Sequence, residues 1–162
     1  MDVDEIELWE AKRKLQRQVR AIDYARCLAE LNVKGLIGGG ATPIQLYEVA
    51  KRNLGDLNIM WREIMGGSWQ RPTRNPNKVA EQYKKDISSI IQEEKNLVHK
   101  EIYDILVRNG INPTEDIIRS GKERLQASSE VLENSCLVVI EPSPLFQRAP
   151  AEPAGGPAGR LI

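Results

Sequence analysis

The sequence predicts a mainly α-helical fold, and three observations lead to this prediction. Apolar residues recur at helical spacing over long stretches, whereas only one short run, residues 136–140, has the β-branched character of a strand. Proline and glycine stand between these stretches, at positions where helices begin and end. The 162 residues are 41% hydrophobic and 28% charged, which is typical of a folded chain with one sizeable core.

The first helix is expected over about residues 4–32. Gly35 then has the place of a C-terminal cap residue, followed by apolar Leu36. Seven apolar residues at helical spacing form a single stripe, which we expect to face the core: Leu8, Leu15, Val19, Ile22, Ala25, Leu28 and Leu31.

The stretch GLIGGGATPIQLY at 35–47 has two interpretations, a hinge between helices or a phosphate-binding loop. A Walker loop needs a lysine at the start of the helix, but Ala41 follows Gly40 and the next lysine is Lys51. A dinucleotide loop needs a preceding strand, whereas a long helix precedes this loop. The pattern therefore favours a glycine-rich hinge.

The second helix is predicted from Thr42 and Pro43 to about Met65, with Gly55 inside it and Trp61 on its apolar stripe. Residues 1–66 thus form a basic N-terminal helical region, and 67–75 form a linker.

A long antiparallel helical hairpin is predicted over 76–134 as the oligomerisation core. Its first helix begins at Pro76 and ends at Gly110, and its second begins in a capping box of Asn112 and Glu115. Adjacent acids on this hairpin, such as Glu93 and Glu94, are expected to be solvated partners on a helix surface.

A short C-terminal β-strand is predicted within 135–142. A lone strand leaves its backbone polar groups unpaired, so pairing with other copies of the chain is one remedy. Packing as an extended segment against the hairpin is the other. The tail, 143–162, is rich in Pro, Ala and Gly and is expected to be disordered. The expected oligomer strand consists of Leu137, Val138, Val139 and Ile140.

No catalytic residue, metal site or cofactor is predicted, so the chain is not expected to be an enzyme. His99 is the only histidine, and Cys27 and Cys136 lie far apart in no metal-binding spacing. The absence of a secretory signal or a long apolar run predicts a cytoplasmic protein with no membrane partner.

The net charge is zero, but it is unevenly distributed. Residues 2–10 carry five acids and no base, while residues 11–80 carry thirteen bases and five acids. The basic stretch 12–20 either contacts phosphates of double-stranded DNA or pairs with the N-terminal acids or a neighbouring subunit. The candidate nucleic-acid contacts are Lys12, Arg13, Lys14, Arg17, Arg20, Arg62, Trp69, Arg71 and Arg74.

In the order of these parts, the chain resembles the small terminase subunits of tailed bacteriophages. The resemblance implies a ring-forming homo-oligomer whose hairpin builds the ring and whose strand closes a barrel. It also implies DNA binding and a partner, the large ATPase–nuclease subunit, in the host cytoplasm. One departure is that the first two helices here are long, whereas the DNA-binding part of that family often has short ones.

The sequence thus predicts a non-enzymatic, oligomeric DNA-binding adaptor for viral genome packaging. The alternative is a structural virion-assembly or scaffold protein that acts through helical protein–protein contacts without nucleic acid.

Overall fold

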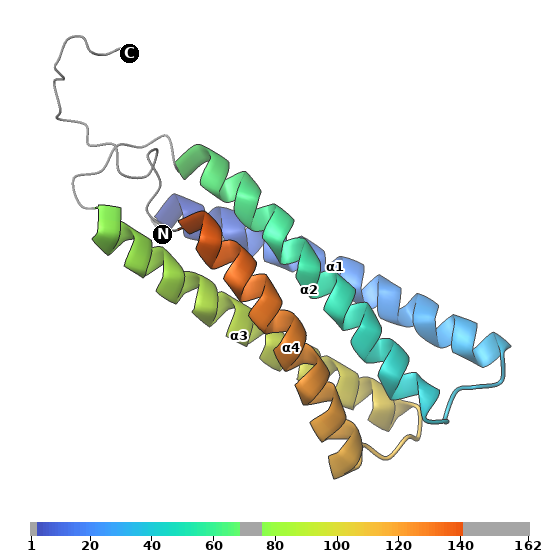
Figure 1. The fold of residues 1–162 in the computed structure, drawn as a ribbon. Coiled ribbons are helices and arrows are strands. Elements are labelled where there is room, and N and C mark those ends of the chain that lie inside the picture. The colour runs from blue at the N-terminus through green and yellow to red at the C-terminus, as the bar shows by residue number, and fades with distance from the viewer. Residues whose placement is uncertain (1–2, 69–75, 141–162) are drawn as a thin grey trace, which may run out of the picture.

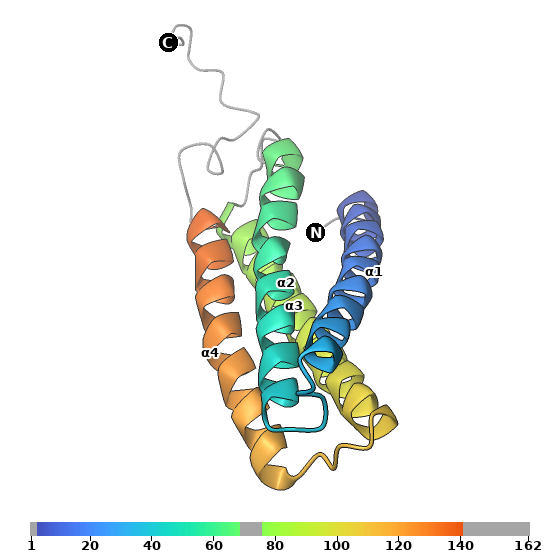
Figure 2. The ribbon, with the colours of Figure 1, turned by 90° about the vertical axis from the view of Figure 1, so that its right-hand side faces the viewer.

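The computed structural model describes residues 3–68 and 76–140, which form four helices (Figure 1). These are α1 (Val3–Val33), α2 (Ala41–Ser68), α3 (Pro76–Arg108) and α4 (Glu115–Ile140). The prediction of a mainly helical fold is confirmed, and no strand occurs in the described residues. Helices α1 and α3 run in one direction and α2 and α4 in the other (Figures 1 and 2).

Two helices end as the sequence predicts. Gly35 and Gly110 have φ angles of 68° and 72°, which glycine adopts without steric cost. The N–H of Leu36 donates to the carbonyl of Leu31 (2.8 Å), and that of Ile111 donates to Leu106 (2.9 Å). These bonds satisfy carbonyls that would otherwise lack partners at the ends of α1 and α3.

The bundle has three close edges and one wide edge. Helix α2 packs closely along both α1 and α4, and α3 packs along α4. By contrast, the α-carbons of α1 and α3 stay more than 8 Å apart along their whole length. Long side chains are therefore needed to close the bundle between α1 and α3.

Residues from all four helices share one apolar core. At one end, Trp61 packs edge-on against Trp9 and Tyr83, with ring centroids 5.9 and 5.7 Å away. The prediction that Trp61 lies in the core is confirmed, since none of its surface is exposed. Regions 1–66 and 76–134, expected as separate parts, thus contribute to the same core.

The prediction for the inner face of α1 is wrong for most of its length, although Leu31 is buried and Leu28 packs against the core as expected. Four residues of the expected core stripe lie on the outside, with exposed fractions of 46%, 62%, 46% and 53%: Leu8, Leu15, Val19 and Ile22. Helix α1 instead turns Trp9, Arg13, Arg20 and Tyr24 inward. The apolar pattern failed as a guide because the side chains facing α1 across the wide edge are carboxylates.

The predicted C-terminal strand is also wrong, because Leu137, Val138, Val139 and Ile140 continue α4 as a helix. The inward face of α4 carries buried residues at spacings of four and three up to the start of this run: Leu125, Ser129, Leu132 and Cys136. The same helix then continues through residues 137–140. No proline or glycine interrupts the chain between Lys122 and Ile140. The predicted tail, 143–162, lies outside the described residues.

Candidate interaction surfaces

The wide edge between α1 and α3 is closed by a network of ion pairs centred on Glu94 of α3. Arg13 donates from Nε to Oε1 of Glu94 (2.9 Å), and Arg17 donates from Nη2 to the same oxygen (2.6 Å). Arg20 donates from Nη1 to Oε2 (3.2 Å). The side chains of Arg13, Arg20 and Glu94 are each at most 2% exposed. One buried carboxylate therefore binds three arginines of α1.

A second carboxylate extends the network by two helical turns. Arg20 donates from Nε to Glu101 Oε1 (2.7 Å) and from Nη2 to Oε2 (3.0 Å), in a two-point contact. The hydroxyl of Tyr24 also donates to Glu101 (3.3 Å). Glu94 and Glu101 are seven residues apart on α3, as Arg13 and Arg20 are on α1, so the two rows match along the parallel helices.

Hydrogen bonds within this network stabilise the charged forms of Glu94 and Arg20 despite their burial. Burial alone would raise the pKa of Glu94, but hydrogen bonds from Arg17 and Arg13 outweigh burial and lower it. Burial would likewise lower the pKa of Arg20, but its bond to Glu101 raises it. Glu94 and Arg20 therefore stay ionised near neutral pH, and each of these charges depends on its partners across the wide edge.

The burial of Arg13 and Arg20 removes both from the predicted DNA-binding face. Neither guanidinium can reach a phosphate without breaking its ion pairs with α3. Arg17 is 32% exposed but is also bonded to Glu94, and Lys12 pairs with Glu63 of α2. The sequence-based expectation of a pairing face was nearer. Arg13 does pair with Glu10, one of the N-terminal acids, but most of the paired acids lie on α3. The prediction that Glu94 is solvated is wrong.

The remaining candidate nucleic-acid contacts are divided. Lys14 and Arg62 are exposed on α1 and α2. Trp69, Arg71 and Arg74 lie outside the described residues, so their part in any contact stays a prediction. The structure thus leaves Lys14 and Arg62 as the described candidates that are exposed.

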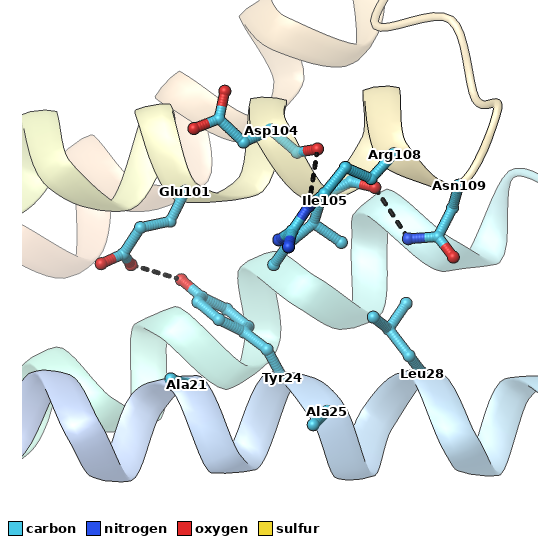
Figure 3. A pocket seen from close by; sticks show the side chains of 9 residues that line it. All are labelled: Ala21, Tyr24, Ala25, Leu28, Glu101, Asp104, Ile105, Arg108 and Asn109. Atoms are coloured by element: carbon cyan, nitrogen blue, oxygen red, sulfur yellow. Dashed lines mark hydrogen bonds between the residues drawn. The ribbon is translucent and has the colours of Figure 1, made fainter.

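A pocket of about 530 Å³ opens where the network ends (Figure 3). On α1 the pocket is lined by Ala21, Tyr24, Ala25 and Leu28, so no arginine of this helix fills this part of the wide edge. The α3 side carries Glu101, Asp104 and Arg108. Because Glu101 is bonded to both Arg20 and Tyr24, it is not available as a general base.

The described nucleophiles and bases do not form a catalytic group. Burial raises the pKa of the Cys136 thiol to about 12, and it also raises that of Cys27, so neither is a thiolate near neutral pH. His99 is half-buried, and its Nδ1 lies 3.1 Å from the hydroxyl of Tyr47. Burial of Tyr47 raises the pKa of that hydroxyl, so it stays protonated.

Four large apolar side chains are exposed together on the outer face of α1. Leu8, Leu15, Val19 and Ile22 lie within a narrow sector of the helix, on the side away from the core. Figure 2 shows α1 at one side of the bundle, with no described helix beyond it. A continuous apolar stripe of this kind is unusual on an isolated folded chain and is typical of an interaction surface.

Comparison with protein-family models, curated proteins and solved structures gives no match to this chain. Among the described helices, none combines the length and apolar character that crossing a bilayer requires. Within the same residues, no three histidine, cysteine or acidic side chains gather as a metal site would require.

Proposed function

We propose that the protein is a non-catalytic helical assembly module that binds a protein partner through the outer face of α1. The observation that carries this proposal is the reversed orientation of α1, in which charged residues face inward and leucine, valine and isoleucine face solvent. An amphipathic helix normally buries its apolar face, because each large aliphatic side chain gains about 1.5–3 kcal/mol on burial. A partner on the outer face would provide that burial.

The charged inner face is what holds α1 in this orientation. Rotating the helix to bury Leu15 and Ile22 would carry Arg13 and Arg20 to the surface and leave Glu94 buried without its cations. An unpaired buried carboxylate costs several kcal/mol. The bundle therefore keeps its apolar stripe available on the outside.

Site-specific photo-cross-linking tests this proposal. A photoreactive phenylalanine analogue at Val19 would mark the outer face, and the same analogue at Val131 would be the control, since Val131 is 70% exposed on α4. In the cell that makes the protein, we expect a protein adduct from position 19 and much less from position 131. Equal yields at the two positions would contradict a docking role for α1.

Binding of double-stranded DNA is the second candidate, and the exposed bases Lys14 and Arg62 are the observation in its favour. A role in genome packaging beside a large ATPase–nuclease subunit rests on the same premise. This proposal requires duplex binding that weakens with salt and is lost in Lys14→Glu/Arg62→Glu. If the wild-type chain fails to bind duplex DNA even at low salt, the assembly proposal stands alone.

A further inference from the structure

The outer face of α1 has the spacing of a coiled-coil seam. One series at seven-residue intervals contains Leu8, Leu15, Ile22 and Ala29, and the other contains Asp4, Ala11, Gln18 and Ala25. All eight positions are exposed, and Ala25, at the edge of the seam, also lines the pocket beside α3. The seam spans residues 4–29, which is about 39 Å at 1.5 Å per residue. Such a repeat packs best against another helix with the same period.

The side chains of the first series are larger than those of the second, and this difference distinguishes a parallel from an antiparallel partner helix. The first series holds the large residues Leu8, Leu15 and Ile22, and the second holds Ala11 and Ala25. In a parallel pair of identical helices each series meets itself, so large residues crowd in some layers and alanines leave gaps in others. In an antiparallel pair the first series meets the second, so large residues lie opposite small ones.

The antiparallel register follows from these pairings. Leu8 lies opposite Ala25 of the second copy, and Ile22 lies opposite its Ala11. Leu15 and Gln18 then form the two central layers, with the two-fold axis between them. Each large residue of the outer layers thus fills the space above an alanine.

The charges along the seam favour the same arrangement. Asp4 and Glu7 lie near the start of α1, and Arg26 lies near its end. A parallel pair would place Asp4 of one copy against Asp4 of the other, in the seam itself. An antiparallel pair instead brings Asp4 of one copy near Arg26 of the other, where opposite charges attract.

We propose that the outer seam of α1 binds the same seam of a second copy of this chain in antiparallel orientation, giving a symmetric dimer. This inference rests on the proposed docking function of α1 and names its partner. It places the self-association surface on α1 rather than on the hairpin and terminal run expected from the sequence. An isologous contact of this kind closes on itself, so it produces a dimer and not a filament.

Light scattering on the full chain tests self-association. At about 50 µM, well above the dissociation constant of a stable dimer, the wild type is expected to have twice the mass of one chain. Leu15→Lys/Ile22→Lys should raise the dimer dissociation constant by at least about 30-fold, because it places cations in the seam. The matched control, Val107→Lys/Val131→Lys, changes two exposed residues of α3 and α4 and should leave the dimer intact.

Cross-linking tests the orientation, in a background of Cys27→Ser and Cys136→Ala. In the antiparallel register the two copies of residue 18 are offset by about 4.5 Å along the axis, and those of residue 25 by about 25 Å. A short bis-maleimide should therefore link Gln18→Cys and not Ala25→Cys. Linking of both variants would overturn the antiparallel arrangement.

The failure of this inference differs from the failure of the proposed function. A wild-type monomer whose position 19 still cross-links to another protein would overturn self-association and keep α1 as a docking surface. A monomer with no adduct above the control would overturn both.

Discussion

The α2–α4 edge and the α1–α3 edge of the bundle show two ways of holding helices together. On the first, Gly121 lies under the ring of Tyr47, and a Cβ built on that glycine would be 2.1 Å from Tyr47 Cζ. On the second, arginine and glutamate side chains bridge two helices whose α-carbons never come within 8 Å of each other. The close edge depends on a glycine, which has no side chain to keep the two helices apart. The wide edge depends on ion pairs between arginine and glutamate.

The comparison shows how a helix can face the core with its polar side. A close edge leaves little room between the two backbones and is filled by short or apolar side chains. A wide edge selects long side chains, and Glu94 supplies a fixed acceptor for Arg13, Arg17 and Arg20. The charged edge therefore sets the rotation of α1, and the apolar stripe on the outside is its consequence.

The largest expected effect comes from removing the central carboxylate. Glu94→Ala should lower the free energy of unfolding by about 3–5 kcal/mol, because it leaves buried arginines without their shared partner. Urea unfolding followed by circular dichroism measures this loss. Glu93→Ala is the matched control, since Glu93 also binds Arg13 but is 59% exposed, and it should cost about 1 kcal/mol or less. Equal losses would show that burial of the network contributes nothing.

The close edge can be tested with two glycines in helices. Gly121→Ala should destabilise the bundle by about 1–3 kcal/mol, because the new methyl group overlaps the Tyr47 ring. Gly55→Ala is the control, since a Cβ there meets no atom within 4 Å, and it should stabilise α2 by about 0.5–1 kcal/mol. Thermal unfolding of both variants gives the signs directly. A stabilising Gly121→Ala would contradict close packing of α2 on α4.

A smaller effect is expected from the protonation of His99. Burial, then the nearby cations Lys122 and Lys95, hold its pKa below the ordinary value of 6.5. The unfolded chain therefore binds this proton more readily, so stability should fall as the pH drops through 6.5 and recover as it rises. His99→Gln should flatten the dependence between pH 7.5 and 5.5, whereas Tyr47→Phe, which leaves the histidine buried, should keep most of it. An unchanged slope in His99→Gln would contradict the assignment.

The smallest effect is expected on the surface between α1 and α2. Lys12 and Glu63 pair there with exposed fractions of 27% and 55%, so water screens their attraction. Glu63→Gln should change the free energy of unfolding by less than about 1 kcal/mol. A larger loss in urea unfolding would mean that α1 is held by its surface pairs as well as by Glu94.

Much of the fold could be predicted from local chemistry. Gly35 and Gly110 marked helix ends, Pro76 marked a helix start, and Gly55 did not break α2, because these effects depend on nearby residues alone. The cap of α4 was misplaced: Thr114 Oγ1 accepts from the N–H of Ile117 (3.4 Å), and the helix begins at Glu115. Short polar residues in series offer several caps, and local chemistry does not choose among them.

The rotation of α1 could not be predicted from its own pattern. Its apolar stripe is regular, and groups far away in the sequence make the opposite face the buried one. These are the acids of α3, some eighty residues away, and Trp61 of α2, which packs against Trp9. A signal did exist, in the matching seven-residue spacing of Arg13 and Arg20 on one helix and Glu94 and Glu101 on another. For residues 137–140, the β-branched composition indicated a strand. The helix that buries Leu132 and Cys136 instead continues through these residues.

The most direct test of the reversed α1 is the unfolding free energy of Leu15→Lys, measured in urea beside wild type at a concentration where both are monomeric. If Leu15 faces solvent, the variant should lie within about 0.5 kcal/mol of wild type. A loss of about 2 kcal/mol or more would place Leu15 in the core. That result would contradict both the charged inner face of α1 and the docking surface built on it.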